Sequence, residues 1–181
     1  MDRWAGILFF VAFGPYAWAI LHGETVPSPV SWAIWALVDT LIRFAMKKKG
    51  AKLGQINGAV AGAWVITILA LFYGQLTMGW VEWGSIALAT VGIISWKTTG
   101  DAKKAIIWSN VAIFMGSFPE FAIGYRTPEQ ENPWAWSIWL ASCICALCAV
   151  RKWDIANALQ PLTFTAIEAT MVFLVVIRPL L

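Results

Sequence analysis

The sequence has few charged residues, and this scarcity argues against a water-soluble domain. Asp, Glu, Lys and Arg together make up 13% of the 181 residues, whereas hydrophobic residues make up 60%. Soluble domains are about a quarter charged. The net charge is only +3, and the charged residues cluster at the ends of apolar segments, so a nucleic-acid surface is not expected. The composition instead predicts a protein embedded in a lipid bilayer.

Residues that several kinds of chemistry require are also missing. His22 is the only histidine, which argues against bis-histidine haem ligation and histidine-based metal sites. The three cysteines share one apolar segment, with gaps that do not form a paired metal-ligand framework. The eight lysines lie between the apolar segments, so none can form a retinal Schiff base. No Ser–His pair, phosphate-binding glycine loop or zincin motif is present. We therefore expect no enzyme, no cofactor and no metal.

Long apolar runs, by contrast, fill most of the sequence. Each is long enough to cross a bilayer as an α-helix, which takes about 20 residues. The breaks between them are short, and backbone amides in hydrocarbon must be satisfied within their own segment. We therefore expect an all-α polytopic membrane protein, an up-and-down bundle of seven transmembrane helices. The predicted spans are residues 5–22, 29–46, 56–74, 79–96, 105–124, 133–150 and 155–177.

Basic residues predict how this bundle is oriented. Ten of the 13 lie at the N-terminus or in alternate loops, and the opposite loops carry mostly glutamates. The positive-inside rule then places the N-terminus in the cytoplasm and the C-terminus outside. We expect an integral protein of the bacterial inner (plasma) membrane.

An internal repeat emerges when the sequence is compared with itself at a shift of 104 residues. Residues 28–35 (SPVSWAIW) then align with residues 132–139 (NPWAWSIW), sharing a proline, an isoleucine and two tryptophans. The shift spans four predicted helices, so helices one to three correspond to helices five to seven, and the two halves run parallel. We expect two three-helix repeats in a 3+1+3 arrangement, at residues 1–77 and 104–181, joined by a linker helix at residues 78–103.

This arrangement resembles the superfamily of SWEET, PQ-loop and PnuC-like (nicotinamide riboside transporter) proteins. The segments Trp32-Ala33-Ile34-Trp35 and Trp136-Ser137-Ile138-Trp139 are similar to the W-x-x-W feature of the PnuC-like branch. The chain most resembles small bacterial seven-helix proteins of SWEET-like topology. The resemblance implies solute transport by alternating access, with prolines as hinges. Four prolines are similar in helix assignment to those of SWEETs: Pro15, Pro29, Pro119 and Pro133.

The two Trp motifs begin stripes that run along one face of the second and sixth predicted helices. Spacings of three and four residues place side chains on one helix face. Facing each other, the duplicated indoles could sandwich a flat ring or a sugar face. The alternative is that these tryptophans belong to the aromatic belts at the bilayer surfaces. The stripes read Trp32, Trp35, Asp39 and Arg43 in the first half, and Trp136, Trp139, Cys143 and Leu147 in the second.

Two carboxylates lie near the middle of the predicted bilayer, Asp39 and Glu168. An ionised carboxylate facing lipid at that depth costs several kcal/mol, so both must face protein or water. Asp39 could pair with Arg43 one turn away, or it could share a proton with Glu168. Glu168 has no cation nearby on its own helix, and it could bind a cation or carry a coupling proton.

Amides and glycines mark the ends of the predicted helices that face the cytoplasm. Asn57 and Gln160 could form an inner gate or bind ligand hydroxyls, or they could simply bond between helices. Gly54, Gly58 and Gly62 recur every four residues, which predicts a flat face that a neighbouring helix can approach closely. That neighbour could come from the same bundle or from a second copy in a homo-oligomer.

Taken together, these features predict a facilitator or proton-coupled carrier of a small polar or ring-containing solute. The alternative is a non-transporting membrane subunit or receptor whose tryptophans meet partner helices or lipid. The predicted substrate-binding residues are Trp32, Trp35, Asp39, Asn57, Trp136, Trp139, Gln160 and Glu168, and the predicted hinges are Pro15, Pro29, Pro119 and Pro133.

Overall fold

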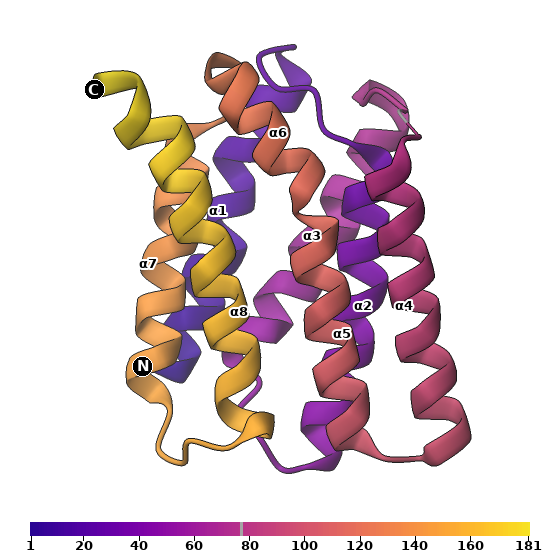
Figure 1. Cartoon of the computed structure of the whole chain (residues 1–181). Coiled ribbons are helices and arrows are strands. Elements are labelled where there is room, and N and C mark those ends of the chain that lie inside the picture. The colour runs from indigo at the N-terminus through magenta and orange to yellow at the C-terminus, as the bar shows by residue number, and fades with distance from the viewer. Residues whose placement is uncertain (77) are drawn as a thin grey trace.

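The computed structural model describes residues 1–76 and 78–181, and within them every side chain except those at positions 81, 85, 89, 92, 95 and 96. Across these residues the regular structure is entirely helical. The helices run alternately up and down between two ends (Figure 1). We call the end with the N-terminus and the lysine-rich loops the basic end, and the other the C-terminal end.

The helices follow the predicted spans closely. Five segments are long and apolar enough to cross a membrane: α1, α2, α3, α5 together with α6, and the segment from α8 to Leu180. The sixth predicted span, α7, is shorter but apolar. The chain is therefore an all-α protein with the helices of a membrane protein. The bounds are α1 Asp2–Leu21, α2 Pro29–Lys48, α3 Gly54–Tyr73, α4 Trp80–Thr99, α5 Ala102–Gly116, α6 Phe118–Arg126, α7 Pro133–Ala149 and α8 Ile155–Val172, with short helical segments at Pro128–Gln130, Phe173–Ile177 and Arg178–Leu180.

The predicted linker, residues 78–103, contains α4. The predicted boundary at residue 77 lies outside the described residues.

Two of the four expected hinge prolines begin helices. Pro29 and Pro133 occupy the first turns of α2 and α7, where a backbone N–H has no helical partner to lose. The residues before them act as N-caps: Ser28 Oγ accepts from the Ser31 N–H at 3.3 Å, and Asn132 Oδ1 accepts from the Ala135 N–H at 2.9 Å. These prolines therefore fix where the helices start.

The other two prolines differ in their effect. Pro15 lies inside α1, which continues unbroken from Asp2 to Leu21. Pro119 follows an interruption at Ser117, which divides the single predicted span 105–124 into α5 and α6. Proline cannot donate to the carbonyl four residues earlier, and its ring crowds that carbonyl, so a helix breaks or bends there. Of the four, only Pro119 stands at a break in a helix.

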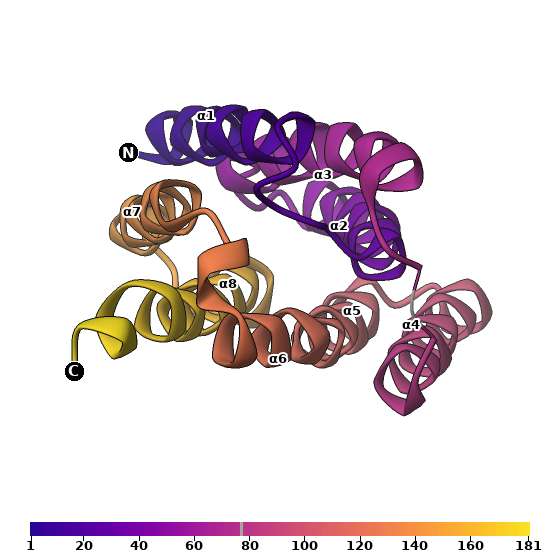
Figure 2. The same ribbon diagram turned by 90° about the horizontal axis from the view of Figure 1, so that it is seen from above.

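The helices form two facing rows, which Figure 2 shows from above. In one row α3 packs between α1 and α2, and in the other α8 packs between α7 and α5. Between the rows, α1 contacts α7 and α2 contacts α5. The remaining helix, α4, packs on α5 and α2 at one side of the bundle.

The glycine face of α3 lies against α1. A Cβ atom added to Gly58 would collide with the backbone oxygen of Gly6, and one added to Gly54 would collide with that of Asp2. A Cβ atom at Gly62 would overlap the ring of Phe13. Close approach of backbones is the usual role of small residues in membrane helices. The face predicted for a neighbouring helix is thus used within one row.

Candidate solute-binding site

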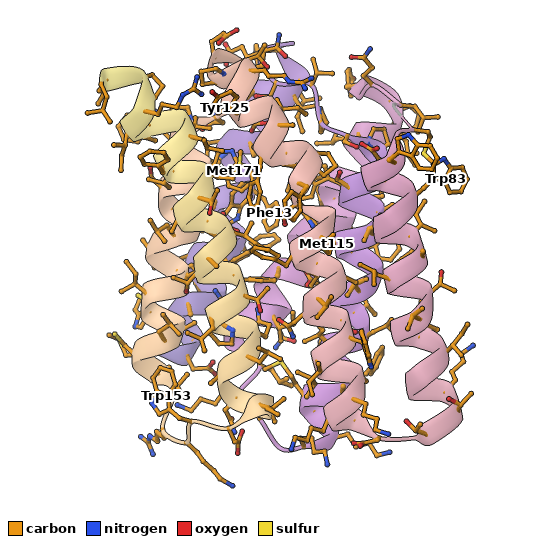
Figure 3. All side chains as sticks on the ribbon, in the orientation of Figure 1. Phe13, Trp83, Met115, Tyr125, Trp153 and Met171 are labelled. Atoms are coloured by element: carbon orange, nitrogen blue, oxygen red, sulfur yellow. The ribbon has the colours of Figure 1, made fainter. Side chains whose placement is uncertain are left out.

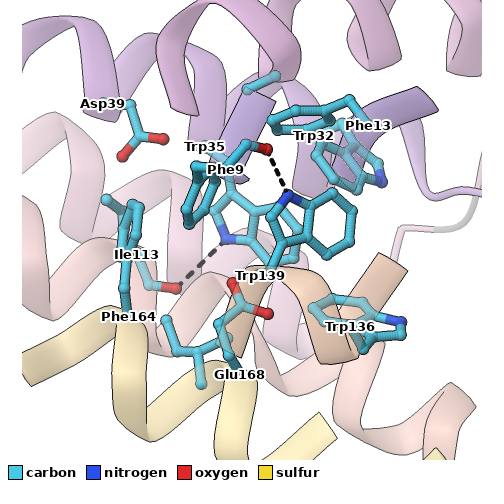
Figure 4. Close-up of a pocket in the computed structure, with 12 residues that line it drawn as sticks. Phe9, Phe13, Trp32, Trp35, Asp39, Ile113, Trp136, Trp139, Phe164 and Glu168 are labelled. Carbon is cyan, nitrogen blue, oxygen red and sulfur yellow. Dashed lines mark hydrogen bonds between the residues drawn. The ribbon is translucent and has the colours of Figure 1, made fainter. Parts of the chain in front are cut away.

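A small cavity lies between the two rows, at the level of the duplicated Trp motifs (Figure 4). Its volume is about 40 Å³. Six helices contribute to its wall: α1, α2, α3, α5, α7 and α8. The lining residues are Phe9, Phe13, Trp32, Trp35, Asp39, Ala63, Ile113, Trp136, Trp139, Phe164, Ile167 and Glu168.

The tryptophans whose side chains the structure describes divide into a buried central group and an exposed group. Trp32, Trp35, Trp136 and Trp139 are 2%, 8%, 1% and 1% exposed. Others project from the surface of the bundle, among them Trp83 and Trp153, which are 59% and 65% exposed (Figure 3). Exposed indoles of this kind suit the interface of a bilayer. The W-x-x-W tryptophans instead line the cavity.

Two indoles hold the rows together through matching hydrogen bonds, drawn as dashed lines in Figure 4. Trp139 Nε1 on α7 donates to the backbone oxygen of Phe9 on α1 at 3.0 Å. Trp35 Nε1 on α2 donates to the backbone oxygen of Ile113 on α5 at 3.4 Å. Residues 35 and 139 are 104 apart, and so are residues 9 and 113. The same bond is therefore made twice, once in each direction between the rows.

The ring geometry of the two motifs is also alike. Trp32 and Trp35 have centroids 4.9 Å apart and an interplanar angle of 81°, and Trp136 and Trp139 have centroids 5.0 Å apart at 68°. Edge-to-face pairs of this kind are favoured by the charge distribution of aromatic rings. Each half thus contributes one preformed indole pair to the cavity.

Asp39 and Glu168 reach the cavity from opposite rows, on α2 and α8 (Figure 4). They are 3% and 6% exposed, and Asp39 Oδ1 and Glu168 Oε2 have no hydrogen-bond partner among the described residues. No Lys, Arg or His side chain is among the cavity-lining residues. These two are therefore the only acidic side chains in the cavity wall, and the wall contains no basic side chain that could pair with them.

Arg43, one expected partner of Asp39, makes a different contact. Its Nε donates to Asn57 Oδ1 at 2.6 Å. Among the described residues the only ion pair joins Lys152 and Asp154, at 3.3 Å. Asn57 is exposed on α3 and does not line the cavity. The structure thus places Asn57 apart from the other predicted binding residues.

A second, larger cavity of about 180 Å³ opens at the basic end, and we call it the vestibule. Gln160, predicted as a binding residue, lines the vestibule rather than the Trp-lined cavity, and its Nε2 has no partner there. Gln55 also lines it, and Gln55 Nε2 donates to Cys143 Sγ at 3.1 Å. Cys143 follows Trp139 by one turn of α7, so this contact lies next to the Trp-lined cavity.

At the C-terminal end, a cluster of buried oxygen-bearing side chains lies over the indoles. Tyr16 and Glu120 are 0% and 1% exposed; Tyr16 packs on the Trp32 ring, and the Glu120 carboxyl lies beside that of Glu131. Glu131 is 5% exposed and accepts from Trp136 Nε1 at 2.8 Å. Burial raises the pKa of Glu131 well above its ordinary value, and the charge of neighbouring Glu120 raises it further. We call Tyr16, Glu120 and Glu131 the acidic seal.

The acidic seal was not predicted from the sequence, although the sequence contains a signal for it. Tyr16 and Glu120 occupy equivalent positions at the shift of 104, each directly after the matched prolines Pro15 and Pro119. In a two-fold repeat, equivalent residues that face the axis meet there, so the predicted repeat could have indicated this pair. Glu131 lies in a loop, where spacing along a helix gives no information.

The contact between α1 and α7 carries two further hydrogen bonds. Ser142 Oγ donates to the backbone oxygen of Ala5 at 2.7 Å, and Asn132 Nδ2 donates to that of Pro15 at 3.1 Å. With the Trp139 bond, they join α1 and α7 along most of their length. Between α2 and α5, the Trp35 bond is the one side-chain hydrogen bond found among the described residues.

No family model, curated protein or solved structure matches the chain. The resemblance to SWEET, PQ-loop and PnuC-like proteins therefore remains a prediction that rests on the residues named for it.

Proposed function

We propose that the chain is a membrane transporter that moves a small polar or ring-containing solute by alternating access between two three-helix bundles. The first bundle is α1 to α3, the second is α5 to α8, and α4 links them. The observation that carries the proposal is the reciprocal pair of indole hydrogen bonds across the cavity, Trp35 to Ile113 and Trp139 to Phe9.

Helix packing supports the parallel repeat that this proposal requires. In each bundle the third helix packs between the first two, and the first helix of each bundle contacts the second helix of the other. A two-fold axis along the membrane normal would produce this pattern. The cavity wall fits the same relation, because eight of its 12 residues form four pairs at the shift of 104: 9 with 113, 32 with 136, 35 with 139, and 63 with 167. The same topology supports placing the chain beside SWEET, PQ-loop and PnuC-like transporters.

The arrangement of the two ends suits an inward-facing conformation. The acidic seal covers the cavity at the C-terminal end, while the vestibule opens at the basic end. The positive-inside rule assigns the basic end to the cytoplasm. A cavity of about 40 Å³ has space for about one water molecule. A solute therefore enters only when the bundles move apart, as rocking transporters do around a central site.

Uptake by proteoliposomes tests this proposal. Purified protein would be reconstituted and offered nucleosides, vitamins, sugars and amines in separate assays. We expect one class to accumulate, and Trp139→Phe or Glu168→Gln to lower its initial rate by about tenfold, which corresponds to about 1.4 kcal/mol of barrier. Trp83→Phe and Glu24→Gln are matched controls, because both wild-type side chains are exposed. If the cavity variants transport as fast as the controls, the cavity is not the solute-binding site.

A second candidate, a non-transporting membrane subunit or receptor, is favoured by the small size of the cavity and the dense aromatic packing around it. On that account the two rows stay together. No offered solute would accumulate, and spin labels placed on the two rows would report a single distance under every condition.

A further inference from the structure

The wall of the central cavity combines aromatic rings with acidic groups and contains no basic side chain. Seven of its 12 residues are aromatic, and Asp39 and Glu168 are the only ionisable side chains among them. Aromatic ring faces carry partial negative charge and attract cations, most strongly when the cation is shielded from water. Both components of the wall therefore favour positive charge.

Three of the four indole N–H groups in the wall are already engaged, and the fourth, Trp32 Nε1, has no hydrogen-bond partner among the described residues. Trp35 and Trp139 donate to backbone oxygens, and Trp136 donates to Glu131. An anion or a sugar would need several such donors and finds only the Trp32 N–H, whereas a cation uses the ring faces of all four indoles. The Trp136 bond to Glu131 lies within one bundle, so it holds the orientation of that ring in the absence of solute and lowers the ordering cost of binding.

The carboxyl groups lack the counter-charge that buried carboxylates require. Asp39 and Glu168 come from opposite rows, and each has a buried oxygen with no partner among the described residues. If both are ionised they repel one another, and no cation in the cavity wall compensates them. A positively charged group between them would relieve the repulsion and supply the missing counter-charge for both carboxylates.

We propose that the solute of this cavity is a compact organic cation of the ammonium type, held between Asp39 and Glu168 and enclosed by the indole and phenyl rings. This inference rests on the proposed function, because it names the class of solute for the same site. A cation bound between the two carboxylates would also draw the bundles together, because each bundle supplies one carboxylate.

A pair of probes that differ in charge but hardly in shape tests the inference. Choline would be compared with 3,3-dimethylbutan-1-ol, in which carbon replaces the quaternary nitrogen. Purified protein in nanodiscs would be titrated with each, and the unfolding temperature measured, because a ligand that binds only the folded state raises it. We expect choline to raise the unfolding temperature and the uncharged alcohol to leave it unchanged. Equal shifts, or no shift with choline, would overturn the inference.

Variants identify the residues that recognise the positive charge of choline. We expect Glu168→Gln and Asp39→Asn each to weaken choline binding by about tenfold or more, a factor that corresponds to about 1.4 kcal/mol. Glu24→Gln, on an exposed glutamate, should bind like the wild type. Trp35→Leu should weaken binding, and Trp83→Leu should not. Choline binding that is unaffected by Glu168→Gln and Asp39→Asn would mean that the cation sits elsewhere and would overturn the inference.

The binding assay separates this inference from the proposed function. Choline binding that depends on Asp39 and Glu168, with no flux in proteoliposomes, would support the cation site and contradict transport. Flux of an uncharged solute through a protein that does not bind choline would support transport and contradict the cation site. An infrared band of a protonated carboxylic acid that is lost in Glu168→Gln, together with no choline binding, would identify a proton as the occupant and overturn the inference.

Discussion

The four tryptophans around the cavity share burial but differ in how firmly their N–H groups are held. The Trp139 bond to Phe9 is 3.0 Å long, within the usual range for N–H donors, whereas the Trp35 bond to Ile113 is 3.4 Å long. We expect Trp139→Phe to lower the free energy of unfolding by about 2 kcal/mol, from the lost bond and the smaller ring. Trp35→Phe should lower the free energy of unfolding by a smaller amount. Thermal unfolding of the two variants checks this, and the reverse order would contradict the hydrogen-bond assignment.

The acidic seal makes stability depend on pH. The ordinary pKa of a glutamate is 4.5, and burial together with the charge of Glu120 raises the pKa of Glu131 in the folded protein. Between these two values the folded state keeps a proton that the unfolded state has lost, so stability falls as pH rises through that window. We expect the unfolding temperature to decrease from pH 4.5 upward.

Substitutions in the same loop test this assignment. Glu131→Gln should flatten the pH profile, because the amide cannot ionise. Glu129→Gln is the control, since Glu129 lies two residues away and is exposed. A profile that keeps its slope in Glu131→Gln would contradict the assignment.

Among single residues, the sequence marked those that line the cavity where its two halves repeat each other or where a charge lies deep in a helix. The shift of 104 marked both Trp motifs, and depth in the bilayer marked Asp39 and Glu168; all of these line the cavity. Asn57 could not be placed, because only the folded chain shows that Arg43 on the neighbouring helix bonds to it. Depth along a helix can be counted from a sequence, but the direction in which a polar side chain points depends on its neighbours.

At the element scale, the packing of α1 against α3 depends on the absence of side chains. A Cβ atom at Gly58 would collide with the backbone of Gly6, whereas one at Gly14 meets nothing within 4 Å. We expect Gly58→Ala to force the helices apart and lower the free energy of unfolding by about 1–3 kcal/mol. Gly14→Ala should be neutral or stabilising by up to about 1 kcal/mol, because alanine is the better helix former. Unfolding measurements that rank the two variants equally would contradict the close contact.

The break between α5 and α6 can be tested by replacing the proline that lies at it. Pro119 lies at the break, and its sequence equivalent Pro15 lies in an unbroken helix. An alanine at 119 could donate to the carbonyl of Met115 and extend α5, which would move Glu120 out of the acidic seal. We expect Pro119→Ala to slow solute uptake several-fold and Pro15→Ala to slow it less. Initial rates in proteoliposomes measure this, and equal rates would argue against a hinge at Pro119.

Sequence patterns predicted where the helices lie but not how they face one another. In a bilayer both the lipid-facing and the core-facing sides of a helix are apolar, so the periodicity that orients helices in soluble proteins is weak. α1 and α7 illustrate this: apolar residues occur all round them, yet only one face of each is buried. The two prolines matched by the repeat, Pro15 and Pro119, also look equivalent in sequence, and only their surroundings determine which one stands at a break.

At the scale of the whole molecule, the two contacts between the rows are unequal. Three side-chain hydrogen bonds join α1 to α7, from Asn132, Trp139 and Ser142. Between α2 and α5 the described residues show one, and it is longer. This asymmetry indicates that the α2–α5 contact separates more easily than the α1–α7 contact.

Alternating access can be tested by measuring distances between the two bundles at both ends of the molecule. After serine replaces the three native cysteines, spin labels would be attached at Glu24 and Glu129 for the C-terminal end, and at Lys49 and Arg151 for the basic end. All four positions are exposed, and each pair joins the two bundles. Alternating access predicts two populations at each end, with a widening at one end accompanied by a narrowing at the other when solute or pH is changed. A single, unchanging distance at both ends under every condition would contradict it.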